Sequence, residues 1–183
     1  VPARVETIEY DPYRSGFIAL VLYKDGERRY ILVPQQVAVG DEIITSAEAK
    51  PKAGNRLPLG KVPVGTFIFN IELKPGAGAR IARSAGNYAE VVAQDAGYTL
   101  VKLPSSEVRK IISTAWASIG AVSNEEYRLV KIGKAGRARH LGIRPKTRGS
   151  AKNAVDHPHG GGEGRSPRGH RRARTKQGRP VGK

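Results

Sequence analysis

The fold class of this 183-residue chain is decided by residues 16–33, GFIALVLYKDGERRYILV. An apolar run rich in β-forming residues, FIALVLY, fills positions 17–23, and RYILV follows at positions 29–33. Asp25 and Gly26 lie between these runs, and Asp-Gly is among the strongest signals for a tight hairpin turn. The stretch therefore predicts two antiparallel strands that are joined at Asp25 and Gly26.

Similar short runs recur at intervals of about ten residues along the first two thirds of the chain. In TFIFNIEL at 66–73 the apolar residues alternate, which predicts one strand with Phe67, Phe69, Ile71 and Leu73 on one face. Residues 46–57 contain few core candidates and are interpreted as a linker. Closing a short sheet removes its exposed edges, so we predict an all-β fold of two small closed barrels. The remaining strands are predicted at 4–10, 42–45, 88–93, 98–103, 108–112 and 116–122.

The positive charge of the chain is concentrated at its C-terminal end. Residues 1–130 contain 16 Lys/Arg and 14 Asp/Glu, whereas residues 131–183 contain 16 Lys/Arg and only two acids. The second segment also has 11 glycines and no aromatic residue, so it cannot bury enough apolar surface to offset its chain entropy. We therefore expect a non-globular basic extension that is ordered by a polyanion.

Composition also limits the classes of partner and cofactor. The chain has no cysteine, which excludes disulfides and thiolate metal sites. No apolar run approaches the roughly 18 residues that span a bilayer. The strong positive charge leaves two polyanions to consider, nucleic acid and an anionic membrane surface. No signal peptide opens the sequence, which begins at Val1 and contains no Met, so the translated start is expected to lie upstream.

Residues 131–164, KIGKAGRARHLGIRPKTRGSAKNAVDHPHGGGEG, carry the most information about function. Basic residues recur every two to four positions, with glycines between them that let the backbone approach a ligand closely. Arginine offers a planar fork to phosphate and lysine a point charge, so the pattern fits a segment that threads folded RNA. Charge alone would fit a solvated tail equally well.

The end of this stretch also raises alternatives to RNA binding. Asp156, His157, His159 and Glu163 have the composition of a metal site, but structural zinc sites commonly use Cys. Gly160 and its neighbours lack the GxxxxGK[ST] pattern of a nucleotide cradle, and no nucleophile-elbow motif is present. We interpret the two histidines as contacts to phosphate or base, and expect no metal, no cofactor and no catalytic residue.

Outside this stretch the assignments are less specific. Arg80 and Arg83 follow the KPGAG turn at 74–78 and fit either a solvated loop or contact with phosphate, and we favour phosphate contact because the nearby charge is positive. Trp116 and the tyrosines are interpreted as core or hairpin packing rather than as stacking platforms. The basic residues that flank the first hairpin, Lys24, Arg28 and Arg29, are interpreted as a solvated face.

Several stretches of the chain resemble the bacterial-type large-subunit ribosomal protein L-two family. The most specific are KIGKAGRARHLGIRP, PKTRGSAKN and VDHPHGGGEG within residues 131–164. VPARVETIEYDP, RYILVPQ, GNRLPL, VPVGTFIFNIELKPG and GAVSNEEY are similar as well, so the likeness covers nearly all of residues 1–164.

The resemblance implies three segments: an oligonucleotide/oligosaccharide-binding-like barrel at 1–50, a Src-homology-3-like barrel at 51–130, and a basic rRNA-binding extension at 131–183. It implies a structural constituent of the large ribosomal subunit near the peptidyl transferase centre, not an enzyme, that supports subunit association and tRNA placement. The implied partners are large-subunit rRNA, other large-subunit proteins, small-subunit rRNA and tRNA, in a cytoplasmic or organellar ribosome. His157 is then the most functionally sensitive position. The expected RNA-binding residues are Arg80, Arg83, Lys131, Lys134, Arg137, Arg139, Arg144, Lys146, Arg148, Lys152, Asn153, His157, His159, Arg165, Arg168, Arg171 and Arg172.

The chain departs from the family pattern at several places. Family members carry an N-terminal extension and a first strand ahead of the matching residues, so the first barrel is expected to lack a strand. Lys152 and Ala154 stand where Met and Pro are usual, and the Trp-Gly element after the polyglycine loop is replaced by an Arg-rich end.

Two other function classes compete with a ribosomal role: a free nucleic-acid-binding module and a metal-dependent enzyme. A free single-strand binder should pair its basic groove with exposed stacking aromatics, and residues 131–183 have none. That composition favours recognition of RNA shape and phosphate.

Overall fold

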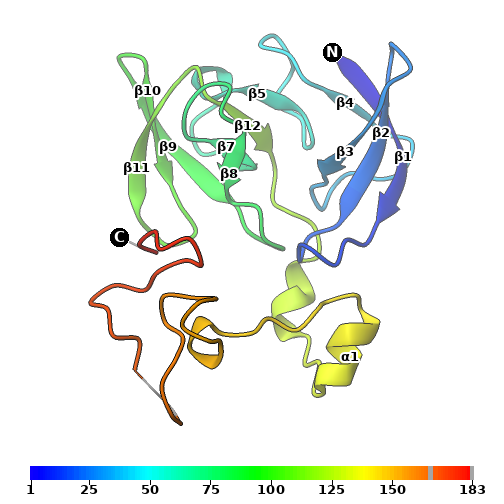
Figure 1. Ribbon diagram of the computed structural model, residues 1–183. Helices are drawn as coiled ribbons and strands as arrows, with labels where there is room; N and C mark the ends of the chain where they lie inside the picture. The colour runs from blue at the N-terminus through cyan, green and yellow to red at the C-terminus, as the bar shows by residue number, and fades with distance from the viewer. Residues whose placement is uncertain (165–166, 182–183) are drawn as a thin grey trace. The chain divides into compact units, whose positions relative to one another are not determined.

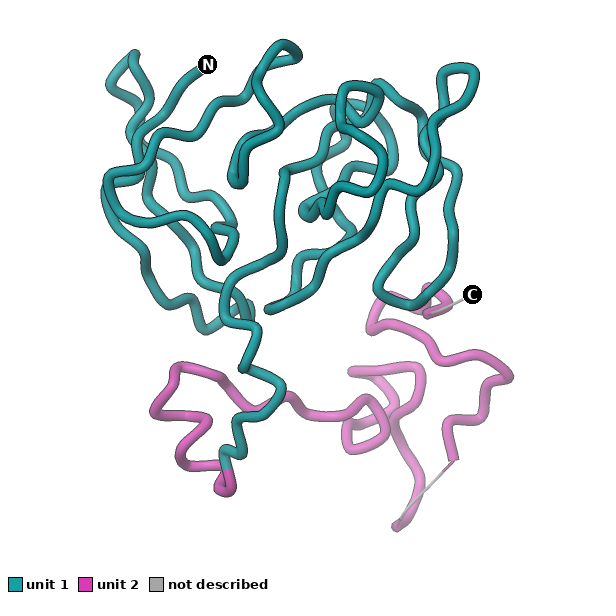
Figure 2. Tube along the Cα trace, turned by 180° about the vertical axis from the view of Figure 1, so that it is seen from behind, with its two compact units in different colours: residues 1–132 teal, residues 133–183 magenta. Residues whose placement is uncertain are grey.

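The computed structural model describes residues 1–164 and 167–181 and divides the chain into two compact units (Figures 1 and 2). The larger unit is Val1–Ile132 and the smaller is Gly133–Lys183. Strands dominate the larger unit, and the one described α-helix, α1 (Ala135–His140), has six residues. The predicted all-β class is confirmed.

The first sheet contains the hairpin from which the fold class was predicted. Its strands β1 (Pro2–Glu9), β2 (Ile18–Tyr23), β3 (Arg28–Leu32) and β4 (Glu42–Ile44) lie in the order β3-β2-β1-β4 and are all antiparallel. The turn between β2 and β3 closes with the N–H of Tyr23 donating to the carbonyl of Glu27 at 2.9 Å. Ala19 and Val21 are fully buried and pack with Val5 in a small aliphatic core.

The second sheet has six strands and a larger core. Its order is β11-β10-β9-β6-β12-β5, and the short hairpin β7 (Ile71–Glu72) with β8 (Ala79–Ile81) forms a separate pair. Leu57, Ile68 and Phe69 are among its fully buried side chains. A 3₁₀ helix, η1 (Leu59–Lys61), follows β5. The six strands are β5 (Arg56–Pro58), β6 (Phe67–Phe69), β9 (Ala89–Asp95), β10 (Tyr98–Lys102), β11 (Val108–Ile112) and β12 (Trp116–Ile119).

The single strand predicted at 66–73 is wrong, because it divides into β6 and β7 at Asn70. Asn70 has a left-handed φ of 50°, which resets the alternation of side chains. Of the predicted face, Phe69 and Ile71 are buried but Phe67 and Leu73 are exposed, and Ile68 is fully buried as well.

The linker predicted at 46–57 is only partly correct, since β5 begins at Arg56 and Leu57 belongs to the core. Asn55 is buried there, and its side chain accepts from the N–H of Ile44 and donates to the carbonyl of Lys50. A parallel bridge between Thr45 and Arg56 completes the junction. These bonds join the two sheets within one unit.

The aromatic side chains lie farther out than predicted. Among the described residues no tyrosine is buried, and Tyr88 and Tyr98 are 45% and 41% exposed. Trp116 is half-buried, and Phe69 is the aromatic residue in the core. Tyr23 is partly buried and packs against the core of the first sheet, so core packing holds for Tyr23 but not for the exposed Tyr88 and Tyr98.

The smaller unit has almost no buried side chain. Across residues 133–164 and 167–181, only His159 is buried, at 8% exposure. Composition predicted this lack of an apolar core. The predicted non-globular extension differs from the compact unit seen here, because backbone hydrogen bonds, such as Gly161 N–H to the carbonyl of Lys152, close its loops.

Candidate nucleic-acid interface

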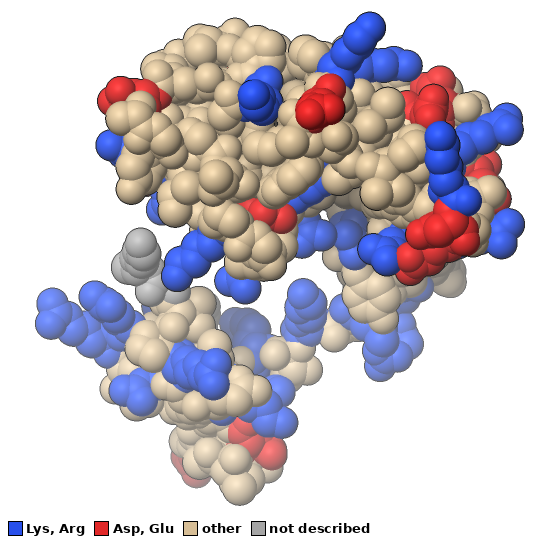
Figure 3. All heavy atoms as spheres, turned by 90° about the horizontal axis from the view of Figure 1, so that it is seen from above, with Lys and Arg blue, Asp and Glu red and all other residues tan. Residues whose placement is uncertain are grey.

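The basic residues of the smaller unit are presented to solvent. Figure 3 shows many Lys and Arg side chains and few Asp and Glu side chains on this unit, in line with its composition. Among the described Lys and Arg candidates of residues 131–183, Lys152 is half-buried and the others are exposed. Within residues 131–164 and 167–181 none of these cations takes part in an ion pair, so their charges are available to a polyanion. The exposed candidates are Lys131, Lys134, Arg137, Arg139, Arg144, Lys146, Arg148, Arg168, Arg171 and Arg172; Arg165 lies outside the described residues.

Helix α1 and its N-cap residue carry three of the candidates within a short segment. Lys134 is its N-cap residue, and Arg137 and Arg139 lie in its last turn together with His140. Cations in the last turn also face the partly negative helix C-terminus, which favours them there. The helix therefore groups basic side chains that are two to five positions apart in the sequence.

Residues 148–161 form a tight loop that requires glycine at two places. A Cβ on Gly149 would lie 2.3 Å from the imidazole of His157, and one on Gly160 would lie 2.2 Å from the backbone oxygen of Asn153. The N–H of Gly160 donates to the carbonyl of His157 at 2.9 Å. Asn153 itself is exposed. Gly149 and Gly160 were expected to let the backbone approach a ligand, and in this structure they let the loop pack against itself.

Three histidines gather at this loop. The ring centroids of His157 and His159 are 4.9 Å apart, and those of His159 and His170 are 5.8 Å apart. The backbone N–H of Arg174 donates to Nε2 of His159 at 3.0 Å, while Nδ1 of His157 accepts from the N–H of His159. His159 thus holds the loop to residues 170–174 through its ring, and His157 is the more accessible of the two predicted ligands.

The surroundings of His159 favour its neutral form. Desolvation lowers its pKa below the ordinary value of 6.5, and the charges of His157, His170, Arg168 and Arg174 lower it further. A neutral ring whose Nε2 accepts a hydrogen bond must carry its proton on Nδ1. The hydrogen bond from Arg174 and the low pKa therefore support the same protonation state.

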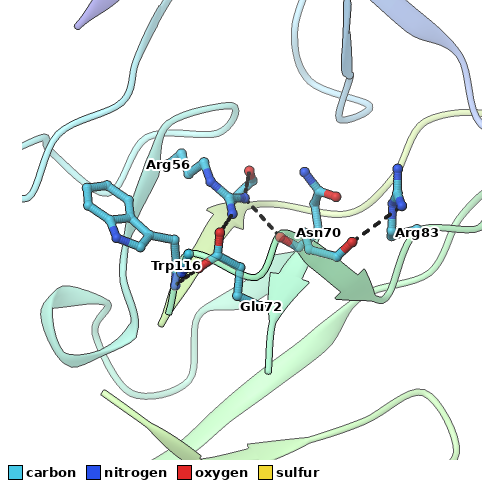
Figure 4. Close-up of polar contacts among 8 residues, drawn as sticks. Arg56, Asn70, Glu72, Arg83 and Trp116 are labelled. Atoms are coloured by element: carbon cyan, nitrogen blue, oxygen red, sulfur yellow. Dashed lines mark hydrogen bonds and ion pairs between the residues drawn. The ribbon is translucent and has the colours of Figure 1, made fainter. Parts of the chain in front are cut away.

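Arg80 and Arg83, in the larger unit, are positioned by the β7–β8 hairpin. Arg80 lies in β8 and Arg83 two residues beyond it, and both side chains are exposed. Nη1 of Arg83 donates to the carbonyl of Ala79 at 3.3 Å, which directs this side chain along the hairpin (Figure 4). Arg80 therefore extends from the hairpin itself, and Arg83 lies just beyond it with its side chain bonded back to β8.

An ion pair between the half-buried Arg56 and the buried Glu72 holds the base of this hairpin (Figure 4). Arg56 donates through Nη2 to Oε1 of Glu72 at 2.9 Å and through Nη1 to the carbonyl of Asn70 at 2.9 Å. Oε2 of Glu72 accepts from the N–H groups of Gly76 and Trp116 at 3.2 and 3.4 Å. One carboxylate thus connects β5, β12 and the turn that precedes Arg80.

The alternatives to a nucleic-acid interface gain no support from the arrangement. Among the described residues, no group of three His, Cys, Asp or Glu side chains could hold a metal ion, so Asp156, His157, His159 and Glu163 do not form the metal cluster that their spacing suggested. In the same part of the chain, no helix is long and apolar enough to cross a bilayer.

Sequence reasoning missed the residues that support the site. Arg56 and Glu72 lie 16 positions apart, and they meet only because β5 pairs with β12 and the β7–β8 hairpin lies against β12. His170 and Arg174 carried a signal only as part of an Arg-rich end. Nothing in their spacing indicates that this end folds onto His159.

Both parts of the sequence match models of known protein families. Residues 1–45 match the model described as Ribosomal Proteins L2, RNA binding N-terminal domain. Residues 52–178 match the model described as Ribosomal Proteins L2, C-terminal domain, and this match includes the histidine loop and the β7–β8 hairpin.

Proposed function

Since the chain belongs to the ribosomal protein L2 family, we propose that it holds large-subunit rRNA in place near the peptidyl transferase centre. Family membership makes it a structural, RNA-binding constituent of the large ribosomal subunit, associated with rRNA and other ribosomal proteins. The place within the subunit, the residues that contact RNA and the partners beyond rRNA are parts of the proposal.

The observation that carries the proposal is the set of exposed cations without ion pairs on a unit whose described residues form no apolar core. Such a unit gains stability from any ligand that binds its folded form. The RNA-binding residues are the 17 named from the sequence. His159 contributes by holding the loop, whereas His157 is free of that hydrogen bond and is the position where the loop faces RNA.

Three segments of the chain divide the work of binding RNA, at residues 1–50, 51–130 and 131–183. The two sheets have separate cores, which supports an oligonucleotide/oligosaccharide-binding-like barrel followed by a Src-homology-3-like barrel. The barrels bind RNA first and fix the position of the protein on it. The basic segment then binds along the RNA and neutralises phosphates where RNA helices converge.

Near the peptidyl transferase centre the chain acts on the shape of RNA and performs no chemistry. By fixing that shape it supports tRNA placement, and contacts with small-subunit rRNA support subunit association. The conformation of the loop around His157 is the link between the protein and this RNA.

Sedimentation of a cell lysate at low and high magnesium, with immunodetection of the chain, tests the ribosomal role. We expect the chain with large subunits at both concentrations. Its presence only in free protein or nucleoid fractions would instead identify an independent nucleic-acid-binding module. Subunits reconstituted without the chain, which we expect to lose peptide-bond formation and subunit joining, test its place near the catalytic RNA.

A further inference from the structure

An open pocket of about 410 Å³ lies beside two partly exposed aromatic rings in the larger unit. Phe67 and Tyr88 line it, and their ring centroids are 4.5 Å apart at an interplanar angle of 46°. The two side chains are 48% and 45% exposed. Its volume lies within the range of roughly 300–1,000 Å³ found for small-molecule sites.

The sheet holds these rings in place. Phe67 begins β6 and Tyr88 directly precedes β9, and the antiparallel pairing of Ile68 with Ala89 sets the two side chains next to each other. The N–H of Gly120 donates to the carbonyl of Phe67 at 2.8 Å, which fixes the backbone under one ring. The aromatic surface is therefore pre-organised before any ligand arrives.

Polar side chains without protein partners share the pocket with the rings. Gln35, Gln36 and Glu125 line it and are exposed. Across the part of the chain that the structure describes, no hydrogen bond or ion pair engages these three side chains. An apolar wall with a few convergent polar groups is the usual composition of a ligand site.

We propose that this pocket takes an unpaired RNA base, which stacks on the Phe67–Tyr88 pair and hydrogen-bonds to Gln35, Gln36 and Glu125. The inference rests on the proposed function, because it takes RNA as the partner. Unstacked bases bind on aromatic side chains and are read along their polar edges, and this pocket offers both features. A carboxylate only accepts hydrogen bonds, and the one ring N–H on the pairing edge of uracil lies between two carbonyl oxygens that repel it, so Glu125 favours a base with an exocyclic amino group.

The first test compares binding of the full chain and its variants to large-subunit rRNA of the same organism. Losing one base stack should lower the affinity of the Phe67→Ala/Tyr88→Ala variant on the order of five- to 100-fold. The slope of log K against log salt should stay unchanged, since stacking releases no counterions. Tyr98→Ala is the matched control. Tyr98 is similarly exposed, at 41%, but it lies on β10, where the ammonium of Lys110 covers its ring, and it does not line the pocket.

Each outcome decides the matter. Unchanged affinity in the double variant would overturn the pocket while leaving the proposed function intact, whereas failure of the proposed function would appear as weak binding of the unmodified chain. A shallower dependence of affinity on salt in the double variant would also overturn the base-stacking proposal, because the lost affinity would then come from lost phosphate contacts. Normal RNA affinity combined with failed incorporation into subunits would assign the pocket to a protein neighbour. Near-ultraviolet circular dichroism confirms that the variant folds.

The second test concerns the amino group. Single-stranded octamers of cytidine and uridine have equal charge, and C8 should compete with rRNA more strongly than U8. Glu125→Gln should reduce that preference. Equal competition by the two octamers against the unmodified chain would remove the carboxylate from base recognition.

Discussion

Arg56 and Glu72 form an ion pair whose nitrogen and oxygen lie 2.9 Å apart at the base of the β7–β8 hairpin. The two side chains are 20% and 9% exposed. Because Glu72 also accepts from the N–H groups of Gly76 and Trp116, the pair links the hairpin to the second sheet. Any change in this carboxylate therefore acts on both stability and the presentation of Arg80.

Replacing Glu72 with Gln should lower the free energy of unfolding by about 2 kcal/mol, since it leaves the guanidinium of Arg56 without its counter-charge. That figure is below the range for fully buried pairs because Arg56 retains some contact with water. Urea denaturation measures the change. Glu107→Gln is the control: its pair with Arg109 is exposed, and its loss should cost less than about 0.5 kcal/mol.

Gly160→Ala should open the histidine loop, because a Cβ there would lie 2.2 Å from the backbone oxygen of Asn153. We expect rRNA affinity to fall at least about tenfold, the effect of losing roughly one good contact. Gly136→Ala is the matched control, since nothing lies within 4 Å of a Cβ at that position in α1. Filter binding compares the two variants, and equal affinities would show that loop closure plays no part in binding.

The contact between His159 and Arg174 should depend on pH. The pKa of His159 is lowered in the folded unit, so protons bind preferentially to the open form. The contact is therefore at full strength above pH 6.5 and weakens as the pH falls below that value. Hydrogen exchange at the amide of Arg174 between pH 5 and 8, in the chain free of RNA, measures it. His159→Phe should remove the protection at every pH; protection that persists in this variant would mean that another group holds the segment.

Arg148→Ala and Lys152→Ala should each reduce the slope of log K against log salt by about one unit, the change expected for one lost phosphate contact. Lys24→Ala is the control, because Lys24 flanks the first hairpin turn and was interpreted as part of a solvated face. A slope that stays constant in the two variants would exclude both residues from the set that contacts phosphate.

The sequence was sufficient where local signals act alone. Asp25 and Gly26 set the first hairpin, and the apolar runs around them are β2 and β3. The scarcity of large apolar residues and the absence of Phe, Trp and Tyr after position 130 correctly predicted a unit whose described residues form no apolar core. The first prediction rests on residues that are close in sequence, and the second on composition.

The sequence was insufficient where backbone conformation or distant pairing decides the outcome. Asn tolerates a left-handed φ better than most residues, but that preference alone does not predict a break in a regular alternation, and this angle at Asn70 divided the predicted strand at 66–73. Arg56 was placed in a linker because residues 46–57 contain few core candidates, and its ion pair with Glu72 depends on a contact between distant segments. The histidine loop was identified as important, but its closure by the N–H of Arg174 depends on tertiary structure.

Among the described residues of the smaller unit only His159 is buried, and this has a consequence for the supply of ribosomes. A unit closed by a few hydrogen bonds opens locally at little cost, so copies that have not yet bound RNA expose cleavable backbone to proteases. Bound RNA raises the cost of opening and protects the same bonds. Degradation would then remove surplus chains selectively, and the amount of this protein would follow the amount of newly transcribed rRNA.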